Sequence, residues 1–238
     1  MTYEVDSIDF EIPLPAACIP AYLEKTYWWA YVHPHAVKVF EREWLVNAIL
    51  WGNLARLRDA ALDALGERIG GKTLQVACVY GDFSLRLADR IATHGSLDVV
   101  DVLPIQLDNL RKKLPTVTNV NTYLRDSSNL QFADGCYDQT VLFFLLHEQP
   151  EAVRRDTLSE ALRVTRPGGK IVVVDYHLPK YFHPLRYLFR PMLHGLEPFA
   201  LDLWNHEIAT WLPAHVRPEQ IQKTISFGGL YQKLVITV

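Results

Sequence analysis

The sequence is poor in cysteine, carries no excess of basic residues and has no long apolar run. Its three cysteines, Cys18, Cys78 and Cys136, are widely spaced and form no CxxC pair, which predicts reduced core thiols rather than a disulfide framework or a zinc site. The net charge of -3 argues against a nucleic-acid partner, because nucleic-acid-binding proteins normally carry a basic surface. No uninterrupted apolar run approaches the roughly 20 residues that cross a bilayer.

Residues 1–11 also lack the basic stretch and apolar run of a signal peptide, so none is expected. Apolar residues make up 49% of the 238 residues and charged residues 21%, a balance that predicts a folded protein with a sizeable core. The length suits one α/β domain with additions, since domains of this kind commonly run to about 200 to 250 residues.

Segments with strand and helix character alternate from residue 73 to the end, which indicates an α/β fold with a parallel sheet covered on both faces. The expected strands span residues 74–79, 97–102, 119–124, 137–146 and 170–175. The expected helices between them span residues 83–91, 104–113 and 151–166. Residues 223–227 and 230–238 flank two glycines and predict a C-terminal antiparallel hairpin. The sequence therefore predicts a Rossmann-like sheet of seven mostly parallel strands.

Two further segments lie outside this sheet. Residues 1–70 are expected to form an N-terminal helical extension or lid, whose helical pattern begins at Pro34 and stops at Gly66. We expect one long helix or two shorter ones, packed on the open edge of the sheet. The remaining domain, residues 71–238, contains an insertion at about residues 176–211 that is rich in aromatic residues, histidine and proline.

The turn after the first expected strand lacks the glycines that such turns usually carry. Residues 73–84 have the outline of a nucleotide-binding strand, loop and helix, but Gly81 is the one glycine in this stretch. Glycine is usual there because it lets the backbone bend tightly and approach the ligand. The pattern predicts a cofactor-binding loop in which other residues have replaced most of the usual glycines.

Downstream motifs give this loop a family context. Asp101 ends the second expected strand, Asp126 follows the third, and residues 132–138 and 163–169 lead into the fourth and fifth. This ordered set resembles class I S-adenosylmethionine-dependent methyltransferases. The resemblance implies that Asp101 binds the ribose hydroxyls and that Asp126 binds the adenine amino group. The cofactor-binding residues that it implies are Ala77, Val79, Tyr80, Gly81, Asp101, Val102, Asp126, Ser127 and Phe143.

The same resemblance places Gln75 at the acid of the family's first motif and Ala77 and Val79 at its two earlier glycines. Side chains at Ala77, Val79 and Tyr80 then occupy part of the volume in which ordinary members hold the methionine part of the cofactor. Either the chain does not bind the cofactor, or it binds it with the methionine arm displaced, so that another atom faces the substrate. A displaced arm changes the reaction, because proximity and orientation select which bond reacts.

The whole chain, including the aromatic segment at residues 27–34, the loop at residues 76–81 and the insertion, resembles the bacterial rhodoquinone biosynthesis methyltransferase-like proteins. This resemblance implies conversion of ubiquinone to rhodoquinone, in which an amino group replaces a ring methoxy group. S-adenosylmethionine is the implied nitrogen donor, and Mn(II) supports the activity. Two other interpretations stay open: a conventional S-adenosylmethionine-dependent methyltransferase of quinones or phenols, and a non-catalytic partner in a quinone-synthesis complex.

Polar residues follow the fourth and fifth expected strands, at the edge where open α/β sheets bind their ligands. His147 is a candidate base, because the ordinary pKa of histidine lies near neutrality. The other candidate catalytic residues are Asp175, His177 and Tyr80. Mn(II) accepts oxygen and imidazole ligands, so His147, Asp175 and His177 form the candidate metal set. The alternative for His177 is that it caps a loop.

Ubiquinone lies in the bilayer, so a surface that reaches the membrane is expected. In this family the position of the insertion is where substrate-binding segments occur. Here it carries Lys180, Arg186 and Arg190 beside an apolar stripe, with no acid until Glu197. A short basic amphipathic helix of this kind can lie in the headgroup layer, and core packing is the alternative. We expect a cytoplasmic protein bound peripherally to the inner membrane.

Overall fold

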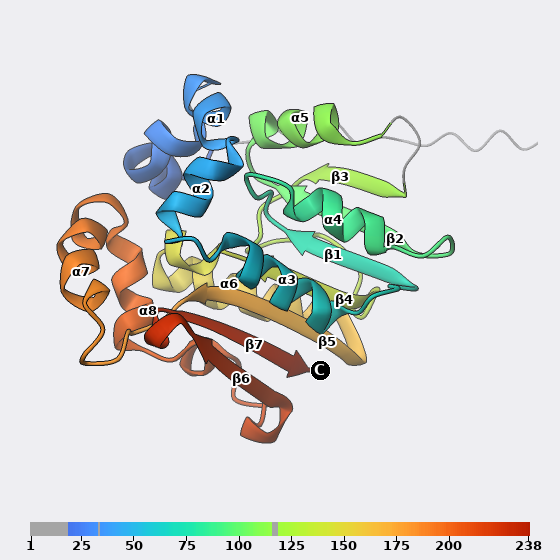
Figure 1. Cartoon of the computed structure of the whole chain (residues 1–238). Coiled ribbons are helices and arrows are strands. Elements are labelled where there is room, and N and C mark those ends of the chain that lie inside the picture. The colour runs from blue at the N-terminus through green and yellow to red at the C-terminus, as the bar shows by residue number, and fades with distance from the viewer. Residues whose placement is uncertain (1–18, 33, 116–118) are drawn as a thin grey trace, which may run out of the picture.

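The computed structural model describes residues 19–32, 34–115 and 119–238, arranged around one mixed sheet (Figure 1). The strand order is β3-β2-β1-β4-β5-β7-β6. The strands are β1 (Lys72–Val76), β2 (Ser96–Asp101), β3 (Val120–Leu124), β4 (Tyr137–Phe143), β5 (Thr165–Tyr176), β6 (Ile221–Ser226) and β7 (Tyr231–Thr237). Strands β1 to β5 pair in parallel, whereas β7 runs antiparallel to β5 and β6. The predicted seven-stranded sheet with a C-terminal antiparallel hairpin is confirmed.

Helices cover both faces of this sheet. The α-helices are α1 (Pro34–Phe40), α2 (Glu43–Ile49), α3 (Leu54–Leu65), α4 (Phe83–Arg90), α5 (Pro104–Lys113), α6 (Glu151–Val164), α7 (Leu185–Leu196) and α8 (Asp202–Asn205). A π-helix, η1 (Leu23–Val32), precedes α1, and 3-10 segments span Leu146–Glu148, Pro198–Leu201, Ile208–Trp211, Pro218–Gln220 and Phe227–Gly229. Helix α6 buries Leu158, Ala161 and Leu162 at helical spacing, which turns this side of the helix toward the sheet. Helices α3 and α6 lie on opposite faces of the sheet (Figure 1).

The strands end where the backbone leaves the extended region. Strand β1 stops at Val76 rather than residue 79, because Ala77 has a φ of +71° and the chain turns there. Strand β4 stops at Phe143 rather than residue 146, because Phe144 has a φ of +54°. Both turns lie at the carboxyl ends of parallel strands, which is where ligands bind in open α/β sheets.

The N-terminal extension differs from the expected arrangement. Its described residues form three α-helices after the π-helix, and α3 packs on a face of the sheet, against β4, β5 and β7, rather than on the open edge. The breaks have a backbone cause: Trp51 and Gly52, with φ values of +53° and +76°, separate α2 from α3. Among the described helices, none combines the length and apolarity that crossing a membrane requires.

A buried arginine ties the insertion to the sheet. The Arg154 side chain on α6 is fully buried. Its guanidinium donates to the carbonyl oxygens of Leu146 (2.9 Å), Gln149 (2.7 Å) and Phe199 (3.1 Å), and it lies 4.2 Å from the ring centroid of Trp211. Leu146 and Gln149 follow β4, whereas Phe199 and Trp211 belong to the insertion. Arg154 therefore fixes the insertion beside the carboxyl ends of the strands, close to the N-terminal helices (Figure 1).

Candidate cofactor and substrate site

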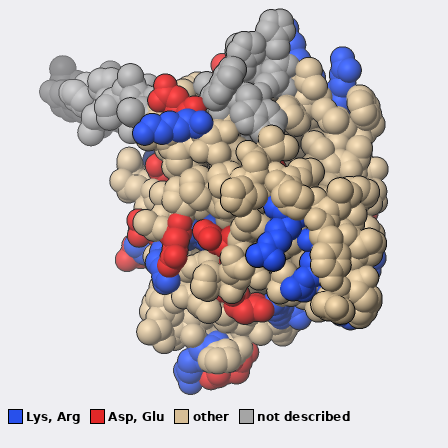
Figure 2. Space-filling view, turned by 90° about the vertical axis from the view of Figure 1, so that its left-hand side faces the viewer, with Lys and Arg blue, Asp and Glu red and all other residues tan. Residues whose placement is uncertain are grey.

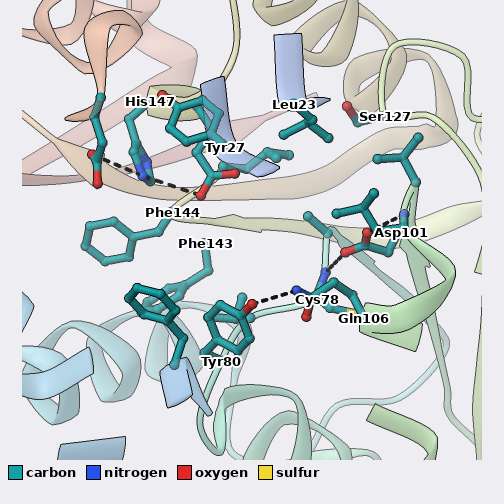
Figure 3. A pocket seen from close by; sticks show the side chains of 18 of the residues that line it. Leu23, Tyr27, Cys78, Tyr80, Asp101, Gln106, Ser127, Phe143, Phe144 and His147 are labelled. Carbon is teal, nitrogen blue, oxygen red and sulfur yellow. Dashed lines mark hydrogen bonds and ion pairs between the residues drawn. The ribbon is translucent and has the colours of Figure 1, made fainter. Parts of the chain in front are cut away.

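A cavity of about 250 Å³ lies at the carboxyl ends of the parallel strands. Its floor comes from the loop after β1, its walls from the segments after β2, β3 and β4, and its cover from the N-terminal helices and the insertion. Leu23 and Tyr27 of η1 contribute to the cover, and both side chains are buried. Figure 3 shows Asp101 and Ser127 on one side of this cavity and His147 on the other.

Asp101, at the end of β2, is the buried acid of the cavity. Its Oδ2 accepts a hydrogen bond from the Cys78 backbone N–H (2.7 Å) and its Oδ1 accepts one from the Leu103 N–H (2.8 Å). Burial raises the pKa of Asp101 to about 6, although these backbone donors oppose the rise. A carboxylate oxygen has more than one acceptor site, so Asp101 keeps capacity for ribose hydroxyls. Val102, the next residue, also lines the cavity.

Asp126 and Ser127 line the same end of the cavity, in the loop after β3. Asp126 Oδ1 accepts hydrogen bonds from the Ser128 backbone N–H (2.8 Å) and hydroxyl (2.7 Å). Ser127 Oγ lies 2.9 Å from Thr157 Oγ1 and accepts a hydrogen bond from Gln149 Nε2 (2.9 Å). These bonds fix the loop and leave the second Asp126 oxygen for an amino group. The acids after β2 and β3 therefore fit the adenosine part of S-adenosylmethionine.

The buried side-chain amide of Gln75 in β1 fixes the loop that follows this strand. Gln75 Nε2 donates to the Ala77 carbonyl oxygen (3.0 Å) and to Ser84 Oγ (2.8 Å). Ala77 and Val79 line the cavity, whereas Gly81, with a φ of +85°, is not part of the lining. Side chains thus stand at the two earlier glycine positions of the class motif, and the backbone at Ala77 still has the left-handed conformation that favours glycine.

Tyr80 forms a neutral wall of the cavity. Its hydroxyl accepts a hydrogen bond from Gln106 Nε2 at 2.8 Å (Figure 3). Its ring stacks on Phe40 of the extension with centroids 5.9 Å apart. Burial raises the pKa of Tyr80 above that of a free phenol. Tyr80 therefore favours its neutral phenol form, and this pKa gives no support to a catalytic role that needs the phenolate. Phe143, another predicted cofactor contact, also lines the cavity.

His147 is oriented by a buried carboxylate. Asp175, at the end of β5, is fully buried, and its Oδ1 lies 3.0 Å from His147 Nδ1. Asp175 Oδ2 accepts the backbone N–H groups of Leu146 (2.8 Å) and His147 (3.3 Å). Asp175 does not line the cavity. It acts by holding the turn after β4 and fixing the imidazole ring.

Two further carboxylates stand near the other nitrogen of His147. Its Nε2 lies 3.6 Å from Glu148 Oε1 and 3.7 Å from Glu197 Oε2. Burial lowers the pKa of His147, but the carboxylates of Asp175, Glu197 and Glu148 outweigh burial and raise the pKa to about 9. The raised pKa favours the protonated ring, in which Nε2 is a donor. The expectation of a histidine base with an ordinary pKa is not met.

His177 lies apart from His147 and Asp175. Its Nδ1 is 2.8 Å from the Gly229 carbonyl oxygen, and its Nε2 is 3.6 Å from Glu207 Oε1. It does not line the cavity; Tyr176 does, with its ring centroid 4.9 Å from that of His147. Within the described parts of the chain, no group of three or more His, Cys, Asp or Glu side chains is arranged to hold a metal ion. The predicted metal set of His147, Asp175 and His177 is thus not assembled, because β5 ends at Tyr176 and the chain turns toward the C-terminal hairpin.

The sequence did not point to Glu197 as a site residue. Glu197 follows α7, at the end of the insertion, and lines the cavity. The available signal was its isolation, since it is the first acid after Asp175. In the aromatic segment at residues 27–34, the side chains of residues 28–34 lie outside the described part of the structure.

The sheet order, the acids after β2 and β3 and the cavity beside them define the class I S-adenosylmethionine-dependent methyltransferase architecture. The model of the "ubiE/COQ5 methyltransferase family" matches residues 31–211, and the chain belongs to this family. This assignment is broader than the one expected from the sequence, which named the rhodoquinone biosynthesis proteins.

Curated relatives agree with this assignment. The chain is 37% identical over 177 residues to "Demethylmenaquinone methyltransferase" of Beutenbergia cavernae, covering 70% of each chain. It is 29% identical over 197 residues to "Ubiquinone/menaquinone biosynthesis C-methyltransferase UbiE" of Haemophilus ducreyi, covering 78% of this chain and 74% of the relative.

Solved structures support the fold. An O-methyltransferase family protein from Burkholderia thailandensis superposes with a TM-score of 0.61 at 16% identity, covering 85% of this chain and 59% of that one. The N-methyltransferase NodS from Bradyrhizobium japonicum, in complex with S-adenosyl-L-homocysteine, gives a TM-score of 0.59 at 13% identity, covering 85% and 96%. The predicted methyltransferase fold is confirmed.

Proposed function

We propose that this chain transfers a methyl group from S-adenosylmethionine to a ring carbon of a quinone precursor. The observation that carries the proposal is the cavity, which joins an adenosine end at Asp101 and Asp126 to an end walled by Phe143, Phe144 and Tyr176. Flat aromatic walls suit a flat ring, because aromatic faces and edges pack favourably. Relatives named as demethylmenaquinone and ubiquinone/menaquinone methyltransferases support the same substrate class.

Bound S-adenosylmethionine supplies an electrophilic methyl group, and the protein orients and shields the reacting groups. Asp101 and Asp126 hold the adenosine, and the N-terminal extension acts as a lid that excludes water. The lid is fastened to the sheet domain by Glu41, which follows α1. Glu41 Oε1 pairs with Lys113 Nζ of α5 at 2.6 Å, and the same ammonium donates to the Gly81 carbonyl oxygen at 3.0 Å. One lysine thus links the lid to the cofactor loop.

A labelling assay tests methyl transfer. The protein is incubated with reduced demethylmenaquinone and with S-adenosylmethionine labelled in the methyl carbon, and the extracted quinone is analysed by mass. We expect the label on the ring, and we expect Asp101→Ala to reduce it strongly. Asp108→Ala, at an exposed acid on α5, serves as the matched control and should retain the activity. Absence of label from the extracted quinone with the wild-type protein contradicts the proposal.

Amino transfer to ubiquinone is the second candidate. The loop after β1 favours it, because side chains at Ala77 and Val79 narrow the part of the cavity where the class holds the methionine arm. The second assay uses ubiquinone and a cofactor labelled at the α-nitrogen. Nitrogen label on the quinone in this second assay supports amino transfer. Methyl label in the first assay, with no nitrogen label in the second, supports methyl transfer. Mn(II) belongs to the second candidate and is included in both incubations.

We also propose that the insertion meets the membrane that holds the quinone. Tyr181 and Phe182 are each 77% exposed, and Leu188 of α7 is 57% exposed. Leu185 lies three residues before Leu188 on α7 and is buried, so only part of the apolar stripe of this helix faces outward. Figure 2 views the side on which α7 lies in Figure 1, and uncharged residues cover most of that face. Exposed aromatic and apolar groups of this kind suit the headgroup layer.

A further inference from the structure

The end of the cavity opposite Asp101 contains hydrogen-bonding capacity that the described residues do not use. Glu197 Oε2 is buried and has no hydrogen-bond partner among them. His147 Nε2 lies 3.7 Å from this oxygen, which is beyond hydrogen-bonding distance. Both residues line the cavity. Because an unpaired buried carboxylate oxygen is costly, this end of the cavity is built for a ligand that completes it.

The two atoms have opposite requirements. Glu197 Oε2 is an acceptor. The Asp175 carboxylate accepts the hydrogen on His147 Nδ1 at 3.0 Å, and His147 Nε2 is a donor in the doubly protonated ring, which the surrounding carboxylates favour. A hydroxyl group can donate to one atom and accept from the other at the same time. A methoxy or carbonyl oxygen only accepts, and it leaves the carboxylate oxygen unpaired. The chemistry of this end therefore selects a hydroxyl.

We propose that Glu197 binds the ring hydroxyl of the substrate, with His147 donating to the same oxygen. This inference rests on the proposed function, because it takes the aromatic ring as the occupant of this end. It assigns the insertion a specific role: α7 delivers the carboxylate that recognises the reacting ring.

The surrounding structure holds both groups in place. The Glu197 backbone N–H donates to the Leu193 carbonyl oxygen of α7 at 2.8 Å. Two residues further on, the Phe199 carbonyl accepts from the buried Arg154 guanidinium at 3.1 Å. The His147 ring is packed edge-on against Phe144 and Tyr176, with centroids 5.9 Å and 4.9 Å away. Such fixed neighbours make recognition of a single hydroxyl geometrically strict.

Binding of a matched pair of probes tests this assignment without turnover. Calorimetry with 1-naphthol and 1-methoxynaphthalene, in the presence of S-adenosylhomocysteine, measures the effect of one hydroxyl. For the wild-type protein we expect 1-naphthol to bind at least about tenfold more tightly, as for a hydrogen bond to a charged group. In Glu197→Leu the affinity for 1-naphthol should fall to that of the ether, while the affinity for the ether stays unchanged.

Three outcomes overturn the assignment: equal binding of the two probes by the wild-type protein, a preserved preference in Glu197→Leu, or an equal loss for both probes. The last outcome identifies a structural role. If the leucine variant does not fold, Glu197→Gln replaces it in the test. This variant keeps the shape of the side chain and an acceptor, and it should show a preference for 1-naphthol between that of the wild-type protein and none. Glu207→Leu, at a more exposed acid of the same insertion, is the matched control and should keep the full preference. Since the readout is binding, it remains informative whichever atom the labelling assay finds on the quinone.

Discussion

Replacing Ala77 by glycine should leave the protein as stable as before or slightly more stable, although glycine normally weakens a folded chain. Ala77 has a φ of +71°, and a residue with a Cβ pays about 1 to 2 kcal/mol in the left-handed region. Glycine relieves this strain and costs about 0.5 to 1 kcal/mol through its greater freedom in the unfolded chain. The net change is a gain of about 0 to 1.5 kcal/mol, or up to about 6 °C in Tm for a domain of this size.

Val79→Gly is the matched comparison, because Val79 lies in the same loop and is absent from the residues with positive φ. It loses apolar contacts and gains unfolded-state entropy without relieving strain, so it should be destabilised by at least about 1 kcal/mol. Thermal unfolding of the two variants, with S-adenosylhomocysteine binding as the test of an intact site, measures the difference. Equal destabilisation of both variants refutes the reasoning, since it shows that the backbone at Ala77 carries no strain.

Three other predictions concern the site, the insertion and the surface. Because burial raises the pKa of Asp101 to about 6 and ribose hydroxyls donate to its ionised form, affinity for S-adenosylhomocysteine should fall about tenfold from about pH 7 to about pH 5. Calorimetry checks this fall, which Asp101→Asn should abolish. Arg154→Met should lower the free energy of unfolding in urea by roughly 3 kcal/mol, because it leaves three carbonyl oxygens without their donor, whereas Arg155→Met, at an exposed neighbour, should cost less than about 1 kcal/mol. Replacing Lys180 and Arg190 by Gln should weaken co-sedimentation with anionic vesicles, by about 1 kcal/mol per residue, and unchanged sedimentation contradicts the membrane proposal.

The sheet was predictable because its signals are local. Apolar runs such as residues 97–102 and the hairpin around Gly228 have the pattern of strands and turns, and the structure has strands or a turn at each. The acids after β2 and β3 were also predictable, because position at a strand end determines their place in an α/β sheet.

The substrate end was not predictable, because it depends on tertiary contacts between distant segments. Asp175 meets His147 across 28 positions, and the insertion brings Glu197 to the same ring. Together these carboxylates move the pKa of His147 to about 9, a change that no local pattern contains. The position of His177 away from His147 was not predictable for a similar reason. It depends on where β5 ends and on the contact of the ring with the Gly229 carbonyl oxygen.

A crystal structure of the complex with S-adenosylhomocysteine tests the central claim most directly, because that claim fixes which end of the cavity holds which part of the cofactor. We predict ribose hydroxyls within hydrogen-bonding distance of the Asp101 carboxylate, adenine beside Asp126 and Ser127, and the sulfur facing the end that contains His147 and Glu197. An adenosine group bound at the His147 end, or a cofactor bound outside the cavity, contradicts the account.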